Sequence, residues 1–495
     1  MLKNRKLLSP LSILMIIIII GAGITWLIPA GRFDTLKFTK GQFEFTTDQG
    51  MQTLDASQTV LDSLHVSIPL ASFQNGNIKK AIAVPGTFHK IESNKQGLAE
   101  IIQAPVKGIT DAIDIILFVL IIGAFINVFH ETGAMTRGLQ TLSRRMKGRE
   151  TWLIIILTFL FSFGGASFGM AEEALAFYPI IVPLFLGAGF DLLLPIAVLF
   201  GGTHLGTLAS FTNPFSTITA SDAAGIAWTD GLTGRIIMFV ITTGIAIGYF
   251  IWYAKKVKKN PSFSYAKSNE DTPQYEALSG GPVSLSKRDR LLLLIFLFTF
   301  LALIGGVVFL DWWLVEMTAL FLAASILIGF INRVPERKFV KQFLKGSEDM
   351  VGVGLIIGAA RGVTVVLNEG HISDSIIFYS SQFVSNFSPS LLIVSVFFLY
   401  IIFTLFITSS SGMAVLTMPI IGGLGMMADI PTREIVNAYL YGMGIMSFMS
   451  PSGLMLPSLA MVNVDLKAWW KFIYPLMLIL SVVCIIALLI GIHLK

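Results

Sequence analysis

One apolar stretch of the chain, FSFGGASFGMAEEALAFYPII, carries residue types that could do chemistry. Gly165, Ser167 and Gly169 fit the G-x-S-x-G pattern of a nucleophilic serine, and two carboxylates, Glu172 and Glu173, follow in the same run. The nucleophile pattern is meaningful where it joins a strand to a helix. Glycine, serine and acid at this spacing would equally suit a binding site for a small polar solute inside a bilayer. The segments that position these residues decide between the two chemistries.

Composition places the chain among polytopic membrane proteins. Of its 495 residues, 54% are hydrophobic and 13% are charged, whereas ordinary soluble domains have about 25% charged residues. The mean hydropathy is +0.77. The net charge of +5 comes from short basic clusters that flank apolar runs, so it gives no indication of nucleic-acid binding. A single cysteine, Cys484, excludes a disulfide framework.

Nine apolar runs are expected to cross the bilayer. The first, Leu11–Ile28, follows MLKNRK, and we expect it to be an uncleaved helix with the N-terminus in the cytoplasm. The others are Ile115–Phe129, Leu192–Ala209, Ile236–Ala254, Leu291–Leu310, Leu314–Asn332, Met350–Leu367, Ile435–Met449 and Trp470–Ile492.

Two longer apolar segments do not fit a simple crossing. Trp152–Leu186 and Leu391–Met427 are interrupted near their centres by FGGASFG and TSSSG. Backbone that leaves helical form at membrane depth is tolerated only where it is buried in protein or lines a wet cavity. We therefore expect each segment to enter and leave the membrane on the same side, as a re-entrant hairpin.

The basic residues support this arrangement. With both hairpins re-entrant, every basic cluster falls on the cytoplasmic side; the clusters are Arg144/Arg145/Lys147/Arg149, Lys255/Lys256/Lys258/Lys259, Lys287/Arg288/Arg290 and Arg333/Arg337/Lys338. If the first hairpin crossed once, the KKVKK run would lie outside. The sequence therefore predicts a C-terminus outside the cell membrane.

An internal repeat indicates the same layout. SFGMA matches SSGMA at an offset of 243 residues, SFTNP matches SFMSP at 237, and IIGA recurs at 235. The extra span Leu291–Leu310 between the halves gives the second half the opposite orientation. Inverted repeats with broken helices are typical of secondary transporters, whose sites lie near the membrane midplane.

The predicted fold is therefore an all-α polytopic membrane protein with an inverted repeat, two re-entrant hairpins and two broken helices. Its expected parts, taken in chain order, are a first-half scaffold, 1–150, with an extracytoplasmic loop, 31–110; first-half transport elements, 151–254 (hairpin 151–187, broken helix 191–226 and a closing span); a cytoplasmic linker, 255–290; a linker span with the second-half scaffold, 291–390; and second-half transport elements, 391–495 (hairpin 391–427, broken helix 434–463 and the last span). The loop 31–110 shows no metal or catalytic pattern.

Each half supplies two devices that could bind a substrate or an ion. One is the hairpin tip and the other is a helix broken near a proline, because proline removes an amide donor. Exposed amides at half-helix starts suit a carboxylate, and freed carbonyls with Ser, Thr and Asn oxygens suit Na⁺. Ordinary membrane packing is the alternative. The candidates are Gly165, Ser167, Gly169, Ser210, Thr212 and Asn213 in the first half, and Ser409, Ser410, Ser411, Gly412, Ser447, Ser450 and Ser452 in the second.

Ionisable residues within apolar segments are costly unless they are paired or hydrated. Glu172 and Glu173 follow the first tip, and at most one of them is expected to face the site because adjacent helical positions point about 100° apart. Arg361 lies mid-span and His204 precedes the first break. A structural pair of one glutamate with Arg361 is one alternative. The other is a site in which a glutamate receives a cation or proton, Arg361 an anion, and His204 a substrate group or proton.

A serine hydrolase is a remote alternative. No sheet is expected around Ser167, and its repeat mate Ser410 does not fit the nucleophile pattern. His204 or His371 would have to act as the base. We expect no enzyme activity and no cofactor other than Na⁺ or H⁺ as a coupling ion; of the predicted site residues, Glu172, Glu173, His204, Ser210, Asn213 and Ser447 are the candidates for ion coupling.

Several motifs together resemble those of a known transporter family. TWLIPAGRFD, AVPGTFHKI, FGMAEE, GTHLGTLASFTNPFSTITASDAAGI and TSSSGMAVLTMPI are similar to the YfcC family, which is related to the anaerobic C4-dicarboxylate carriers of the ion transporter superfamily. The resemblance covers essentially the full length. It implies a homodimeric elevator-type transporter in the bacterial cytoplasmic membrane, with both hairpins and both broken helices in the moving domain. Sodium-coupled relatives carry Ser-Asn-Thr tips, and the tips here lack asparagine.

The resemblance leaves two substrate classes open. Family members are associated with arginine–ornithine exchange, and others with dicarboxylates or short acids. A basic amino acid needs donors for its carboxylate and an acid for its far end, which the hairpin amides and Glu172 or Glu173 would supply. A dicarboxylate would use Arg361 as a second anchor, and the two glutamates disfavour it unless one is protonated. The sequence therefore favours a basic amino acid.

Overall fold

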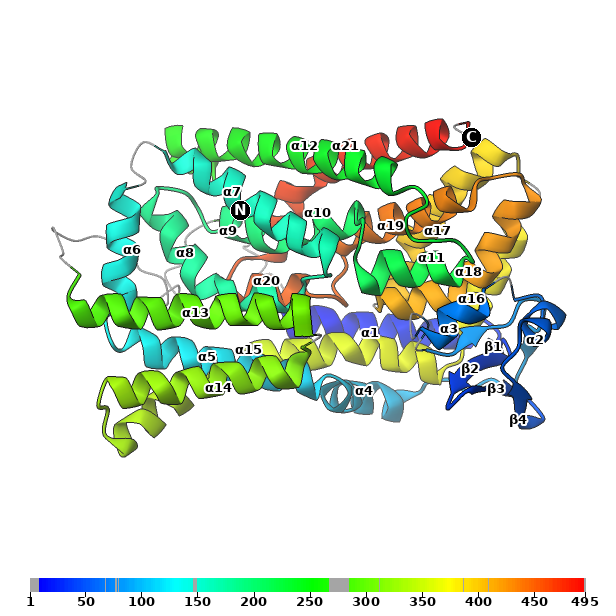
Figure 1. Ribbon diagram of the computed structural model, residues 1–495, viewed down its shortest axis with the longest axis horizontal. Coiled ribbons are helices and arrows are strands. Elements are labelled where there is room, and N and C mark those ends of the chain that lie inside the picture. The colour runs from blue at the N-terminus through cyan, green and yellow to red at the C-terminus, as the bar shows by residue number, and fades with distance from the viewer. Residues whose placement is uncertain are drawn as a thin grey trace, which may run out of the picture.

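The structure is a computed structural model that describes residues 9–66, 68–75, 78, 80–145, 149–266, 285–310, 312–385, 387–407 and 409–493 (Figure 1). Within these ranges, nine helices are long and apolar enough to cross a membrane. They are α1 (Pro10–Leu27), α5 (Ile113–His130), α7 (Glu150–Ser167), α12 (Leu232–Lys259), α13 (Lys287–Leu310), α14 (Leu314–Ile331), α15 (Glu336–Glu369), α17 (Pro389–Phe406) and α21 (Leu466–Gly491).

The other helices are shorter and connect or interrupt these spans. They are α2 (Gln58–Ser63), α3 (Leu70–Gln74), α4 (Leu98–Asp111), α6 (Ala134–Arg145), η1 (Glu172–Phe177), α8 (Tyr178–Gly187), α9 (Leu193–Ile196), η2 (Ala197–Gly201), α10 (Gly202–Leu208), η3 (Pro214–Ile218), α11 (Thr219–Ala223), η4 (Pro261–Phe263), α16 (Ser373–Val384), α18 (Ser410–Met427), α19 (Thr432–Ser447) and α20 (Met455–Met461).

The loop between α1 and α4 folds into a small β unit, so the expectation of an all-α chain was wrong for this segment. Its strands are β1 (Gly31–Arg32), β2 (Thr35–Thr39), β3 (Gln42–Thr47), β4 (Gly50–Asp55), β5 (Ile82–Ala83) and β6 (His89–Lys90). They form a two-stranded sheet, β1-β6, and a four-stranded sheet, β4-β3-β2-β5. Lys40 and Gly41, both with positive φ, make the tight β2–β3 turn in which Thr39 pairs with Gln42.

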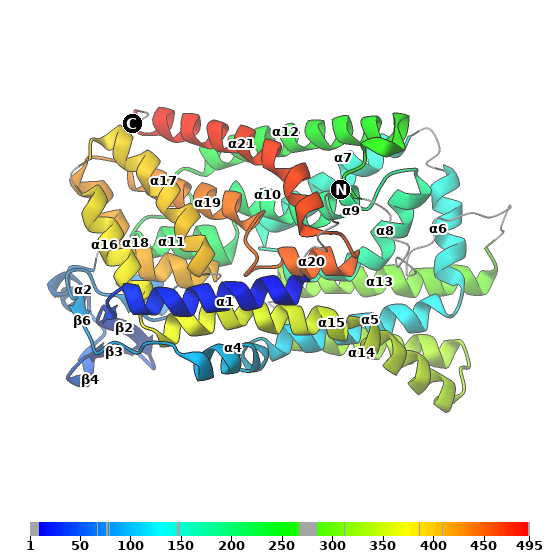
Figure 2. The same ribbon diagram turned by 180° about the vertical axis from the view of Figure 1, so that it is seen from behind.

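Both predicted hairpins are present as helix–break–helix units. α7 and α8 lie in the half of the molecule that contains α6, whereas α17 and α18 lie in the half that contains the sheets (Figures 1 and 2). The set of nine long apolar helices nevertheless differs from the predicted one. It includes the hairpin arms α7 and α17, and it leaves out Leu193–Leu208 and α19, which are the short first arms of the two broken helices. Length and hydropathy alone do not separate a crossing from the first arm of a hairpin.

The internal repeat is visible in the order of the elements, with a single offset. Equivalent helix ends in the two halves lie 239 residues apart. Ala134 and Ser373 begin α6 and α16, and Glu150 and Pro389 begin α7 and α17. Leu208 and Ser447 end α10 and α19. The offset of 243 that pairs Ser167 with Ser410 therefore does not match equivalent positions. Ser167 ends the outgoing arm of one hairpin, and Ser410 begins the returning arm of the other.

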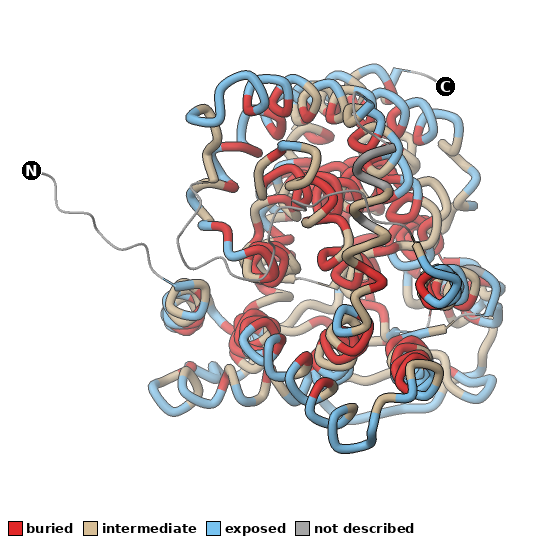
Figure 3. The backbone as a smooth tube through the Cα atoms, turned by 90° about the vertical axis from the view of Figure 1, so that its left-hand side faces the viewer, coloured by how far each residue is buried: buried red, intermediate tan, exposed pale blue. Residues whose placement is uncertain are grey.

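The helices pack in two groups. In one, α15 lies against α1, α4 and α5, and α14 lies against α5; in the other, α10 packs on α7, α19 packs on α17, and α10 and α19 contact each other. The groups meet where α15 contacts α17 and α20 and where η1 contacts α5. Figure 3 shows buried backbone concentrated in the interior and exposed residues around the outside.

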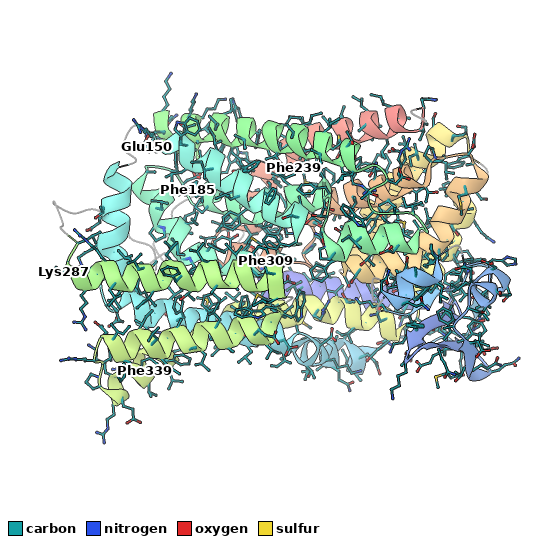
Figure 4. All side chains as sticks on the ribbon, viewed as in Figure 1. Glu150, Phe185, Phe239, Lys287, Phe309 and Phe339 are labelled. Atoms are coloured by element: carbon teal, nitrogen blue, oxygen red, sulfur yellow. The ribbon has the colours of Figure 1, made fainter. Side chains whose placement is uncertain are left out.

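The ends of the molecule differ in character. Glu150, Lys287 and Phe339 lie toward the end that contains α6 (Figure 4), and the two sheets occupy the opposite end (Figure 1). The basic starts of α7 and α13 therefore share one end, as the sequence predicted. Of the predicted linker 255–290, residues 267–284 lie outside the described ranges, and so does Lys147. Which end faces the cytoplasm stays a prediction.

Close contact between α7 and α10 depends on glycine. A Cβ on Gly165 would overlap the carbonyl oxygen of Thr203, and one on Gly206 would overlap the carbonyl oxygen of Ser162. Small residues allow such backbone approach between membrane helices.

We expect Gly206→Ala to lower the free energy of unfolding by about 1–3 kcal/mol, because the added methyl group forces the two helices apart. The measurement is the midpoint of thermal unfolding of the purified protein in detergent. Gly244→Ala on α12 is the matched control, since no atom lies within 4 Å of the added Cβ. Equal midpoints for the two variants would contradict this account of the packing.

Candidate functional site

The first hairpin tip is a tightly wound helix end. The carbonyl oxygen of Gly164 accepts from the amides of Phe168, Gly169 and Met170 at 3.2, 3.1 and 3.2 Å. Gly169 has φ +80°, a conformation that suits glycine. The Ser167 hydroxyl donates to the Phe163 carbonyl at 2.6 Å. The serine side chain is therefore bound to its own helix.

The first break is hydrogen-bonded to this tip. The amides of Phe211 and Thr212 donate to the Ala166 carbonyl at 3.1 and 3.2 Å, and the Thr212 hydroxyl donates to the Ser167 carbonyl at 3.0 Å. Asn213 donates from Nδ2 to the Gly165 carbonyl at 2.9 Å. The break thus satisfies three successive carbonyls at the end of α7. We call this set of contacts the tip–break junction.

Asn213 also starts the helix that follows the break. Its Oδ1 accepts from the amides of Phe215 and Ser216 at 2.9 and 3.2 Å, as an N-cap does. Ser210, fully buried, bonds to the Ser216 hydroxyl at 3.1 Å and to the Thr217 hydroxyl. The side chains predicted to bind an ion here are therefore committed to protein contacts.

The two glutamates have different surroundings. Glu173 is 5% exposed, and its Oε2 accepts from the Ala171 amide at 2.9 Å. Glu172 is only partly buried, and Arg361 is the opposite charge within its electrostatic range. Both begin η1, which contacts α5 of the other helix group. Glu172 is therefore the more exposed of the two glutamates. Which of them faces a substrate stays a prediction.

The second tip presents its polar groups at the start of α18. The Ser409 hydroxyl accepts from the Gly412 amide at 3.2 Å, which caps the helix. It also accepts from Lys80 Nζ at 3.0 Å. The Ser410 carbonyl accepts from the Tyr439 hydroxyl at 2.9 Å, and Ser411 lies in the first turn. Thr408 lies outside the described residues.

Arg361 on α15 has a different partner from the one the sequence suggested. Its Nε lies 2.9 Å from Asp111 Oδ2 at the end of α4. The alternative of a structural pair with Glu172 or Glu173 was therefore wrong, because α4 packs along α15 and brings Asp111 closer. The positive charge of Arg361 acts on both Glu172 and Lys80. Its charge therefore influences one charged group near each tip, Glu172 at the first and Lys80 at the second.

The second break meets the first near His204. His204 Nδ1 lies 2.8 Å from the Phe200 carbonyl, and its ring centroid is 6.2 Å from that of Phe448 in the second break. The Ser447 hydroxyl donates to the Met443 carbonyl at 2.7 Å. Ser450 and Ser452 bond to each other at 2.8 Å. These contacts pack the two broken helices together and leave His204 no acidic partner among the described residues.

Comparison with known proteins identifies the chain's relatives. The profile of the DcuC family, described as C4-dicarboxylate anaerobic carrier, matches residues 7–493. The chain belongs to the C4-dicarboxylate anaerobic carrier family. It is therefore a membrane transporter of this family.

Two relatives span nearly the whole chain. One, an uncharacterized protein of Haemophilus influenzae, is 37% identical over 96% of this chain and 94% of its own. The other, the putative basic amino acid antiporter YfcC of Escherichia coli, is 27% identical over 98% and 96%.

Two solved structures are similar at 14% identity. Neisseria gonorrhoeae MtrF, described as one of a class of antimetabolite efflux pumps, has a TM-score of 0.41 over 99% of this chain and 96% of its own. The Alcanivorax borkumensis YdaH transporter has a TM-score of 0.38 over 98% of both chains.

The structure shows how the serine of the G-x-S-x-G pattern is bonded. Among the described residues, neither His204 nor His371 makes a hydrogen bond with Ser167, whose hydroxyl is used within α7. Sequence reasoning missed Lys80, which lies 329 positions from Ser409 in a loop with no motif. No local pattern could have found it, because only the fold brings the two together.

The tip–break junction predicts a structural role for Asn213. We expect Asn213→Ala to lower the free energy of unfolding by about 1–2 kcal/mol through loss of the cap, and further through the unpaired Gly165 carbonyl. Asn213→Ser keeps a neutral cap acceptor but loses the bond to the Gly165 carbonyl, so its thermal midpoint should fall between those of the alanine variant and the parent. A shifted dependence of transport on Na⁺ with an unchanged thermal midpoint would instead make Asn213 an ion ligand.

Proposed function

We propose that this carrier is a secondary active transporter for a small carboxylate-bearing metabolite, with a basic amino acid as its best candidate substrate. The observation that supports this most is the presence of an acidic and a basic side chain near the two tips, Glu172 and Arg361. Glu172 stands at the first tip, Arg361 acts on it from α15, and the second tip offers its α18 amides and hydroxyls. The two charges are not paired with each other in the ion pairs of the described residues.

A basic amino acid is complementary to such an arrangement. Its carboxylate would lie on the Arg361 side, where cation and helix-start amides favour an anion. Its distal cation would lie against Glu172, whose partly buried position strengthens the attraction compared with water. The name of the Escherichia coli relative, a putative basic amino acid antiporter, points to the same class. Exchange of arginine for ornithine is the reaction we propose.

A C4-dicarboxylate or another short organic acid is the second candidate. The family description and the positive charge of Arg361 favour it. In that case a glutamate near the site would have to carry a proton, which would couple transport to H⁺. Na⁺ is the other candidate coupling ion, with the carbonyls and hydroxyls of the breaks as its ligands.

The proposed mechanism is an elevator movement. The helix group built on α7, α10, α17 and α19 would slide past the group built on α15, α5 and α14, and carry both tips with it. The two groups contact each other through α15 with α17 and α20 and through η1 with α5, and this is the interface that would slide. A homodimer in the bacterial cytoplasmic membrane, with the N-terminus inside and the C-terminus outside, completes the proposal.

Counterflow in proteoliposomes distinguishes the substrates. Vesicles loaded with ornithine should take up labelled arginine faster than unloaded vesicles, because exchange avoids return of the empty carrier. Labelled fumarate should not enter under the same conditions. Fumarate uptake without arginine uptake would replace the amino acid by a dicarboxylate and make Arg361 its anchor.

Glu172→Gln tests the role of the acid. We expect it to raise the KM for arginine about tenfold or more, as the loss of one hydrogen bond to a charged group predicts. It should leave competition by anions without a cationic end unchanged. Glu348→Gln, which removes one carboxylate that is 71% exposed on α15, is the matched control. Equal effects of Glu172→Gln on cationic and anionic ligands would remove the glutamate from the site.

A further inference from the structure

The outer β unit reaches into the candidate site through one lysine. Lys80 Nζ donates to the Ser409 hydroxyl at 3.0 Å and lies 3.6 Å from the position of a Cβ on Gly412. It therefore stands over the first turn of α18, where the Gly412 amide also points toward Ser409. We refer to residues 31–97, which hold the sheets, as the outer domain.

Lys80 has an electrostatically unfavourable position in the absence of an anion. Among the described residues no carboxylate forms an ion pair with it, and its hydrogen-bond acceptor is a neutral hydroxyl that already accepts from an amide. The Lys80 side chain is exposed, but partial desolvation by the surrounding protein, together with the like charge of Arg361, lowers its pKa. A cation beside the start of a helix also opposes the helix dipole. Each of these costs would be reduced by a negatively charged ligand between Lys80 and the tip.

The outer domain is attached to α1, which packs on α15, and to α16. At the end of α1, Trp26 Nε1 donates to the Gln96 carbonyl at 2.9 Å, and the Gln96 amide donates to Thr25 at 3.0 Å. The Phe33 amide donates to Asp374 on α16 at 3.1 Å. Phe88 stacks on Phe378 at 3.9 Å between ring centroids. Lys80 is thus held by elements that are not part of the second hairpin.

The same domain also touches the elements that would move. β5 packs against α18, and the Ser72 hydroxyl donates to Asp222 Oδ1 on α11 at 3.2 Å. In Figure 1 the outer domain lies at the end of the molecule where α16 and α18 are found. Lys80 therefore connects the outer domain to the tip of the second hairpin.

We propose that Lys80 is a specificity-determining residue that binds the carboxylate of the substrate at the second hairpin tip. The inference rests on the proposed function, because it assigns a receptor to the carboxylate that the transporter is proposed to carry. The carboxylate replaces the Ser409 hydroxyl as the acceptor, since a charge-assisted hydrogen bond is stronger than a neutral one. The exchange also releases the tip from the outer domain. The carrier therefore distinguishes a carboxylate-bearing substrate from an amine without one.

Ligand-induced thermal stabilisation of the purified full-length protein tests this directly. Three probes are used: arginine, fumarate and agmatine, the last being arginine without its carboxylate. The variants are Lys80→Gln, Lys80→Arg and Lys37→Gln, which removes one exposed lysine from β2 of the same domain. We expect Lys80→Gln to weaken binding of the stabilising carboxylate about tenfold or more, the loss of one hydrogen bond to a charged group. Lys80→Arg should retain most of the affinity, and agmatine should bind the parent and Lys80→Gln equally.

The outcomes separate this inference from the proposed function. Fumarate binding that depends on Lys80, without arginine binding, would retain the lysine as a receptor and overturn the amino acid. Arginine binding that is the same in Lys80→Gln and Lys37→Gln would overturn the receptor and retain the substrate. If Lys80→Gln weakened the binding of arginine and of agmatine equally, the lysine would only hold the tip in place, and its role in recognition would be overturned. Absence of stabilisation by any carboxylate in the parent would overturn it as well.

Discussion

Backbone that leaves helical form at membrane depth must have its polar groups satisfied by protein, and the first half of this carrier depends on that constraint. The end of α7 exposes the carbonyls of Gly165, Ala166 and Ser167, and the break before Pro214 supplies the donors that meet them. Each unpaired group would cost several kcal/mol in hydrocarbon, at the upper end of the usual range. The hairpin and the broken helix are therefore one unit, and neither is stable without the other.

The same constraint separates structural from functional polar residues. Asn213 and Thr212 form hydrogen bonds in the tip–break junction, and Ser210 forms its hydrogen bonds within the break. These residues position the tip and have few hydrogen-bonding groups left for a ligand. The charged groups differ from these polar residues in their protein contacts. Glu172 and Lys80 have no carboxylate–cation partner of their own among the described residues, and Arg361 acts on both. We therefore propose that recognition in this carrier depends on charged groups that belong to different structural elements.

Those supports explain how binding can be connected to movement. Glu172 belongs to the first hairpin, Arg361 to α15, and Lys80 to the outer domain. In the proposed elevator mechanism, a ligand that contacts all three would change the relative energy of the positions that the two helix groups can take. A ligand shifts such an equilibrium only through its different affinity for each state. The 239-residue repeat supplies the geometric basis, because equivalent hairpins enter from opposite ends of the molecule.

The sequence by itself determined the membrane class, the two hairpins, the two breaks and the family, because hydropathy, glycine and proline act locally and leave a pattern in the chain. It named Glu172 and Glu173 as candidate site residues, and the role of each stays a prediction. It paired Ser167 with Ser410 wrongly, because a match between two short motifs does not account for residues inserted at one of the tips. It missed the strands between residues 31 and 90, whose short segments carry little pattern. Only the tertiary structure decided the partner of Arg361 and the position of Lys80, because contacts between residues hundreds of positions apart follow from helix packing and have no local signal.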